Sequence, residues 1–157
     1  MQQILVNDIS PYDIAYLAGL FDGEGCVRLA VINRGKEQKR GQNRSVYLGV
    51  EIGNTYEPIL HWLKDNFGGH VYKVKRSNLK YSQMWSWHLH GDSLKLLISL
   101  ILPYSRIKKE ELSLLLIAVN MKRGPSNKMH PESYYDKIEE LAENVLQARE
   151  ANHQKQV

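Results

Sequence analysis

The sequence predicts an α+β fold around an antiparallel sheet, with an α-β-β-α-β-β-α core and further helices after it. Two pairs of strand-like segments, 26–33 with 46–53 and 70–76 with 83–90, flank a helix-like segment at 55–67. Consecutive strands form antiparallel hairpins, whereas parallel strands need a long crossover between them. We find no linker composition and no second copy of any motif, so residues 1–157 are expected to form one domain with its core at about 10–122.

The first predicted element is a helix that begins after Ser10. Serine is a good N-cap, Pro11 is tolerated in the first turn, and Asp13 stands where an acid completes a capping box. The helix is expected to continue to about Asp22, where glycines follow.

Two strands come next, separated by a polar and basic loop. Residues 26–33 are rich in apolar and β-branched types, which favour strands. In the second strand, apolar and other residues alternate, so one face is buried. The inward set is Val46, Leu48, Val50 and Ile52, and the outward set is Tyr47, Gly49, Glu51 and Gly53.

The remaining elements are a helix, a hairpin and three helices. The helix at 55–67 ends at Gly68-Gly69, and a turn-like segment joins the strands 70–76 and 83–90. Asp92 is expected to cap a helix that Pro103 ends. Further helices are predicted at 109–121 and, after Pro131, at about 131–150.

The composition excludes several classes of protein. There is no apolar run long enough to span a membrane and no secretory leader, so no membrane partner is expected. The single cysteine, Cys26, cannot form an intrachain disulfide and suits a reducing, intracellular compartment. The histidines lack a paired zinc spacing, although His88 and His90 alternate on a predicted strand.

The net charge of +4 is modest, but the basic residues are concentrated. Segment 28–47 holds six of them against Glu37 alone, and segment 73–80 adds four with no acid. Concentrated positive charge on neighbouring segments is typical of polyanion binding, and an ordinary solvated surface is the alternative. The residues are Arg28, Arg34, Lys36, Lys39, Arg40 and Arg44, then Lys73, Lys75, Arg76 and Lys80.

The stretch LAGLFDGEG, residues 17–25, places Asp22 and Glu24 among glycines at the end of the first helix. Carboxylate and backbone carbonyl oxygens close together suit a hard divalent cation such as Mg²⁺, which often completes its shell with water and phosphate. A plain helix stop with solvated acids is the alternative. A calcium loop is excluded because Cys26, Val27 and Asn33 occupy its required positions, and a nucleotide-binding loop is excluded because the glycines follow a helix.

Small residues upstream of the acids predict a close helix–helix contact. Ala15, Ala18 and Gly19 lie at three- and four-residue spacings, where another helix can approach. Packing inside the core of one chain is the alternative.

LAGLFDGEG resembles the signature of the LAGLIDADG homing endonucleases, and the order of elements to residue 121 is similar to the core of that family. The resemblance implies a curved antiparallel sheet that sits as a saddle on the DNA major groove. It also implies two signature helices at the centre, with their acids at the cut. Because this chain has one copy of the motif, it implies a homodimer on a pseudo-palindromic site of double-stranded DNA.

The resemblance assigns roles to a few residues. Glu24 stands at the position of the metal-binding acid, where aspartate is commoner, and the carbonyl of Gly23 is a further metal contact. Asp22 is expected to serve turn structure and the dimer interface, together with Ala15, Ala18 and Gly19. Asn54 is the polar residue that orders water, and Lys108, or its neighbour Lys109, is the catalytic lysine. The basic residue sometimes found after the polar one is absent, since Glu57-Pro58 occupies that place.

Strand alternation selects the residues expected to face DNA. On the third strand, Tyr72 and Val74 are predicted to point inward and Lys73 and Lys75 outward, while Trp85 on the fourth strand is either a DNA contact or core. Lysines of the loop would contact phosphates, whereas arginine and glutamine can read bases and Glu51 can accept from cytosine. The full set is Arg28, Ala30, Ile32, Arg34, Lys36, Lys39, Arg40, Arg44, Tyr47, Gly49, Glu51, Gly53, Lys73, Lys75, Arg76 and Gln83.

The function implied is a site-specific homing endonuclease that hydrolyses both DNA strands, leaves short 3′ overhangs and promotes intron mobility. The expected cofactor is Mg²⁺ or another divalent cation such as Mn²⁺, and Ca²⁺ is expected to bind without supporting cleavage. The alternative is a maturase of the same fold, which grips host intron RNA and cuts nothing. The resemblance implies a bacterial or phage-host cytoplasm, or an organelle that encodes its own intron.

Overall fold

The computed structural model describes residues 9–33, 44–75, 80–121 and 130–154. The order of elements follows the prediction. They are α1 (Pro11–Glu24), β1 (Gly25–Asn33), β2 (Arg44–Asn54), α2 (Glu57–Phe67), β3 (His70–Lys73), β4 (Trp85–His90), α3 (Asp92–Ile101), α4 (Lys109–Asn120) and α5 (Glu132–Gln154).

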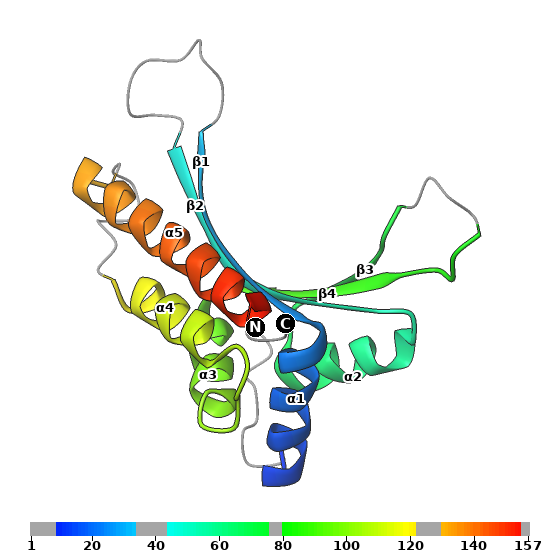
Figure 1. The fold of residues 1–157 in the computed structure, drawn as a ribbon. Helices are drawn as coiled ribbons and strands as arrows, with labels where there is room; N and C mark the ends of the chain where they lie inside the picture. The colour runs from blue at the N-terminus through cyan, green and yellow to red at the C-terminus, as the bar shows by residue number, and fades with distance from the viewer. Residues whose placement is uncertain (1–8, 34–43, 76–79, 122–129, 155–157) are drawn as a thin grey trace.

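The strands form one antiparallel sheet in the order β1-β2-β4-β3. β1 pairs with β2 and β3 pairs with β4, and the pairing of β2 with β4 joins these two hairpins at the middle of the sheet. Figure 1 shows the sheet bent into a trough, with the helices below it and its concave side open above. The α+β fold with a curved antiparallel sheet, predicted from the sequence, is confirmed.

The core lies between the convex side of the sheet and the helices. Leu48, Val50 and Ile52 of β2 are buried as alternation predicted, and Trp87 of β4 is fully buried beside them. The helices supply the other side of this core through Leu17 and Phe21 of α1, Leu60, Leu63 and Phe67 of α2, and the apolar faces of α3, α4 and α5. Fully burying one such side chain contributes about 1.5–3 kcal/mol, so the sheet and helices stabilise each other.

The start of α1 is as predicted, and its end lies two residues beyond the expected one. Asp13 N–H donates to Ser10 Oγ at 3.1 Å, and Ser10 N–H donates to the Asp13 carboxylate at 3.3 Å, which completes the capping box. The helix then continues past Asp22 through Glu24, and Gly25 leaves it in an extended conformation, with φ −80°. Glycine is needed at 25 for space, because a Cβ there would lie 2.3 Å from the buried Phe21 ring.

Glycines also stand at the C-terminal end of α2 and at the N-terminal end of α3. Gly68 ends α2 at φ 79°, in the left-handed region that favours glycine, as predicted for this pair of glycines. Asp92 was expected to cap α3, but Gly91 occupies the N-cap at φ 82° and Asp92 is the first helical residue.

The face predicted for Tyr72 is wrong. The residue pairs with Ser86, is 43% exposed and bonds through its hydroxyl to His88 on the concave side. Val71, not Tyr72, packs against the core. Alternation therefore puts Lys73 on the same side as Val71, away from the concave surface, which corrects the expectation that Lys73 faces DNA.

Candidate active site and concave surface

The end of α1 brings the acidic turn to one end of the sheet. Glu24 is the last residue of the helix, and both it and Gly23 are exposed. Because Gly25 pairs with Ile52, the antiparallel register puts Asn54 at the same end of the sheet as Glu24. The two predicted site residues thus come from the adjoining ends of α1 and β2.

Lys108 lies against the C-terminal end of α1. Its Nζ donates to the carbonyl oxygens of Asp22 at 2.7 Å and of Phe21 at 3.2 Å. The C-terminal end of a helix carries partial negative charge and attracts a cation, so this ammonium neutralises part of it. Lys109 is the first residue of α4 and is exposed. Of the two lysines considered, only Lys108 has its ammonium in this set of contacts.

Asp22 holds the loop that carries Lys108. Its carboxylate accepts from the Ser105 hydroxyl at 2.6 Å and from the backbone N–H groups of Arg106, Ile107 and Lys108 at 2.7, 3.2 and 3.1 Å. Burial favours a higher pKa, but the hydrogen bonds from Ser105 and the backbone outweigh it and lower the pKa of Asp22. Asp22 therefore ties α1 to the 105–108 loop within one chain, in keeping with the expected turn role.

The side chain of Asn54 forms a local hydrogen bond with the backbone. Its Oδ1 accepts from Tyr56 N–H at 2.9 Å, which fixes the turn between β2 and α2. The role in ordering water remains a prediction, and the amide nitrogen is the group left to perform it.

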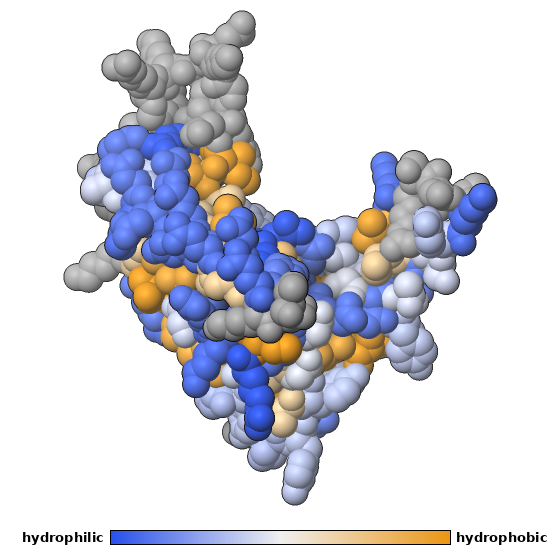
Figure 2. Space-filling model, viewed as in Figure 1, coloured by the Kyte–Doolittle hydropathy of each residue, from blue (hydrophilic) through white to orange (hydrophobic). Residues whose placement is uncertain are grey.

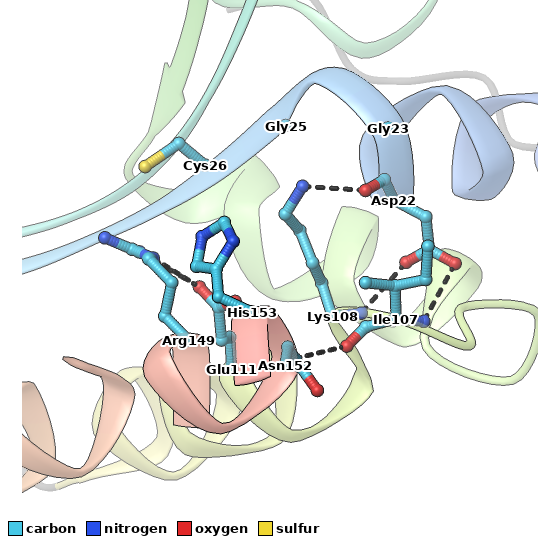
Figure 3. A pocket seen from close by; sticks show the side chains of 10 residues that line it. All are labelled: Asp22, Gly23, Gly25, Cys26, Ile107, Lys108, Glu111, Arg149, Asn152 and His153. Atoms are coloured by element: carbon cyan, nitrogen blue, oxygen red, sulfur yellow. Dashed lines mark hydrogen bonds and ion pairs between the residues drawn. The ribbon is translucent and has the colours of Figure 1, made fainter. Parts of the chain in front are cut away.

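A pocket of about 460 Å³ adjoins these groups. Its lining combines the end of α1 and start of β1 with α4 and the last turns of α5, as Figure 3 shows. Arg149 donates to the buried Glu111 carboxylate at 2.9 Å and to the Val27 carbonyl at 3.1 Å. Asn152 donates to the Ile107 carbonyl at 2.8 Å, so α5 holds the Lys108 loop from the side opposite Asp22.

The donor set at the end of α1 fits a divalent cation. The exposed Glu24 carboxylate and the Gly23 carbonyl are the hard oxygen ligands that Mg²⁺ prefers. Across the described ranges, no group of three or more His, Cys, Asp or Glu side chains could hold a metal. Glu24 and Gly23 would therefore supply only part of the coordination shell of a metal, which phosphate, water or a second chain would complete.

The concave surface is lined by the outward residues of all four strands. Cys26, Arg28, Ala30 and Ile32 of β1 pair with Glu51, Gly49, Tyr47 and Ser45 of β2, and Ser86, His88 and His90 of β4 continue the same face. Figure 2 shows this side hollowed between two arms of the molecule. Five residues of this surface were not among those predicted to face DNA, although alternation against buried Trp87 places the first three: Ser86, His88, His90, His70 and Tyr72.

Most predicted DNA-facing residues on β1 and β2 do lie on this surface. They are Arg28, Ala30, Ile32, Tyr47, Gly49, Glu51 and Gly53. Arg34, Lys36, Lys39, Arg40 and Arg76 lie outside the described residues. Gln83 uses its amide nitrogen within the hairpin, donating to the carbonyls of Val74 at 2.9 Å and Met84 at 2.7 Å. Lys75 is exposed beyond β3, and Trp85 packs against the core.

Arg44 is placed differently from the prediction. It is an even-numbered β2 residue, like Val46, and its side chain points to the helix side of the sheet. There it pairs with Glu132 and with Glu139 (2.7 Å) and stacks 4.8 Å from the centre of the Tyr135 ring. Arg44 thus docks α5 on β2, which corrects the expectation that it faces DNA.

The surface of α1 available to a second chain also differs from the predicted one. Ala15 and Gly19 are exposed as expected, but Ala18 is 0% exposed and packs in the core of its own chain. Tyr12 and Tyr16, which are 86% and 52% exposed, extend the Ala15–Gly19 face instead. Small residues suit both the core of one chain and a contact with a second chain. The packing of α1 in the fold decides which of them are buried.

Solved structures share this fold. I-CvuI bound to its target with 2 mM Ca aligns at a TM-score of 0.60 and 21% identity, over 91% of this chain and 96% of that chain. I-CvuI with an I-CreI target in 2 mM Mg, its DNA uncleaved, gives 0.60 and 22% over 90% and 95%. I-SmaMI bound to uncleavable DNA gives 0.58 and 16%, over 85% of this chain but 43% of that one.

These likenesses define the class of protein as one with the fold of homing endonucleases. The sequence profile of the LAGLIDADG endonuclease family matches residues 17–119. The chain belongs to the LAGLIDADG endonuclease family. A comparison with curated proteins finds no match. Among the described residues, no helix is both long and apolar enough to cross a membrane.

Proposed function

We propose that this chain is a site-specific, metal-dependent DNA endonuclease that cuts both strands of a pseudo-palindromic site as a homodimer. One observation carries the proposal. An exposed carboxylate, Glu24, stands at the end of the sheet whose concave face carries Arg28 and three histidines, and Lys108 lies against the same helix end. An acid, a cation and a surface for a polyanion therefore meet in one place. The proposal includes promotion of intron mobility, which membership of the family supports.

The proposed chemistry assigns each group a task. Glu24 and the Gly23 carbonyl would hold Mg²⁺, which when bound supplies Lewis acidity and a more acidic water. Asn54 would orient the attacking water through its amide. Lys108 would stabilise the negative charge that develops on the phosphate oxygens, from a position fixed by Asp22 and Asn152.

The homodimer would supply the second acid. Two copies of the exposed α1 face, centred on Ala15 and Gly19, would pack together and bring the two Glu24 carboxylates to the two strands. Cuts on opposite strands on either side of the two-fold axis would leave the short 3′ overhangs that the family resemblance implies.

The test starts from a pool of random-sequence duplexes recovered by binding to the parent chain in Ca²⁺, then exposed to Mg²⁺. Glu24→Gln is expected to bind the same duplexes but to cut them about 10²-fold more slowly or worse, because the metal loses its carboxylate. Glu143→Gln, which changes an exposed acid on α5, is the matched control and should cut like the parent.

Three outcomes would overturn parts of the proposal. If Glu24→Gln cuts as fast as the parent, the assigned metal ligand is wrong. If the parent selects no duplex, the DNA interface is wrong. If it binds structured intron RNA in preference and cuts nothing, the maturase alternative replaces the nuclease.

A further inference from the structure

A chain of polar contacts crosses all four strands of the concave surface. Arg28 of β1 contacts Glu51 of β2, which contacts Ser86 and His88 of β4, and His88 bonds to Tyr72 of β3. None of these contacts involves the end of α1 or Lys108. The chain is therefore a feature separate from the proposed cutting site.

Both carboxylate oxygens of Glu51 are engaged in these polar contacts. Its Oε2 accepts from Arg28 Nε at 2.8 Å and NH2 at 2.6 Å, while its Oε1 accepts from Ser86 Oγ at 2.8 Å and lies 3.2 Å from His88 Nε2. The Glu51 side chain is only 19% exposed. Burial favours a higher pKa, but the hydrogen bonds from Ser86 and Arg28 outweigh it, lower the pKa and keep the group a carboxylate. A carboxylate with both oxygens engaged is a poor acceptor for a cytosine amino group.

Arg28 has N–H donors that Glu51 does not contact. Glu51 contacts one edge of the guanidinium, which carries Nε–H and one of the two N–H groups of Nη2. The other terminal N–H groups form a second edge, with two parallel donors, and the side chain is 52% exposed. Two parallel N–H donors match the O6 and N7 acceptors of guanine in the major groove. A fixed guanidinium also loses less rotamer freedom on binding.

We propose that Arg28 reads a guanine in the major groove and that Glu51 is the positioning residue that fixes the guanidinium for this contact. Ser86 and His88 hold Glu51 in turn, so the second strand pair of the sheet sets the direction of a side chain on the first. In a homodimer the guanine would occur once in each half-site. This inference rests on the proposed function, because it needs duplex DNA on the concave surface.

The experiment compares base preferences. Duplexes bound in Ca²⁺ from a randomised pool are sequenced for the parent, Arg28→Lys, Glu51→Gln and the double variant. Arg28→Lys keeps the charge but loses the paired donors, so the guanine preference should fall by roughly five- to a hundred-and-fifty-fold at one position per half-site. Glu51→Gln should weaken preference at the same position, and the double variant should be no worse than Arg28→Lys.

A second readout separates positioning from folding. Affinity for nonspecific duplex should be unchanged or higher for Glu51→Gln, because a negative charge leaves the DNA-facing side, whereas a misfolded variant would lose that affinity. Lys64→Ala, an exposed change on α2 away from the concave surface, is the control and should keep the parent's preferences.

The outcomes distinguish this inference from the proposed function. If the parent selects DNA but Arg28→Lys keeps every preference, Arg28 reads no base and this inference alone is overturned. If Glu51→Gln changes preference at a different position from Arg28→Lys, Glu51 reads a base itself and its positioning role is wrong. If the parent selects no DNA, both proposals are overturned.

Discussion

At the scale of single residues, Asp22 shows how the signature can keep an acid for structure. One carboxylate receives a hydroxyl and three backbone N–H groups from the loop at 105–108. Hydrogen bonds to a charged acceptor stabilise by about 1.5–3 kcal/mol, and here several of them converge on one carboxylate. The two acids of the motif thus divide their work: Asp22 organises the chain, and the exposed Glu24 is left for the proposed chemistry.

Asp22→Asn is predicted to destabilise the fold by about 1–3 kcal/mol and to flatten its acid dependence. Because the pKa of Asp22 is lowered by folding, its contribution is complete above the ordinary value of 3.8 and is lost as pH falls through the lower folded-state pKa. Urea unfolding of parent and variant at a series of pH values checks this. The difference between them should shrink as the pH falls below about 4. A constant difference down to pH 2 would contradict the assignment.

At the scale of elements, α5 is fastened at both ends. Near its start Glu139 pairs with Arg44 of β2, and near its end Arg149 bonds to both Glu111 of α4 and Val27 of β1. Glu111 is 1% exposed, and Arg149 donates hydrogen bonds to its carboxylate at 3.2 and 2.9 Å. The helix therefore sets the position of the Lys108 loop relative to β1.

Arg149→Met is predicted to destabilise the protein by about 3–5 kcal/mol, because it leaves a buried carboxylate without its cation. The double variant Glu111→Met/Arg149→Met should recover most of this loss. Lys137→Ala, which removes the exposed Lys137–Glu140 pair, is the control and should cost about 0–1 kcal/mol. Urea unfolding measures all three. An Arg149→Met variant within 1 kcal/mol of the parent would show that the Arg149–Glu111 pair does not fasten α5.

The order of the helices and strands was predicted from the sequence more completely than the side of the sheet on which each residue lies. Alternation in β2 was decisive because four apolar residues in a row of eight share one face, and all are buried or pack against the core. In β3 only four residues form the strand, and Val71 and Tyr72 compete for the inward side, so the pattern gave the wrong face. Arg44 was read as part of a basic loop, although the parity of β2 would have put it beside Val46.

Within the candidate site, the sequence predicted residues that belong to a local motif, but it did not predict which distant residues contact one another. Glu24, Gly23 and Lys108 follow from the signature and its resemblance. The Arg149–Glu111 and Asn152–Ile107 contacts join residues 38 and 45 positions apart. No periodicity connects such positions, because tertiary packing alone brings them together. The same holds for the Arg28–Glu51–His88 contacts, which needed the strand order to be known.

At the scale of the whole molecule, one exposed helix face is suited to association with a second chain. The exposed face of α1 runs through Tyr12, Ala15, Tyr16 and Gly19 and lies next to the end that carries Glu24. A Cβ on Gly19 would meet nothing within 4 Å in the single chain. Glycine in a helix interior costs about 1 kcal/mol relative to alanine, and no contact within the described part of the chain requires glycine at this position.

Gly19→Ala is predicted to stabilise the folded monomer by up to about 1 kcal/mol and yet to weaken self-association, because the added methyl would separate two closely packed helices. Unfolding and sedimentation equilibrium measured together check the two effects. Gln147→Ala, an exposed helical site on α5, is the control and should leave association unchanged. Association that is unchanged or tighter in Gly19→Ala would exclude this face as the dimer contact.

The fastening of α5 also has a consequence for the order of folding. Its bonds to Val27 and Arg44 close loops of 122 and 95 residues, whereas the β1–β2 and β3–β4 pairs are formed by neighbouring segments. Closing long loops is slow because the entropy must be lost before the contacts form. During synthesis the sheet can therefore assemble while the loop with Lys108 still lacks its support from Asn152. We therefore expect the concave surface to form before α5 fixes the position of the Lys108 loop.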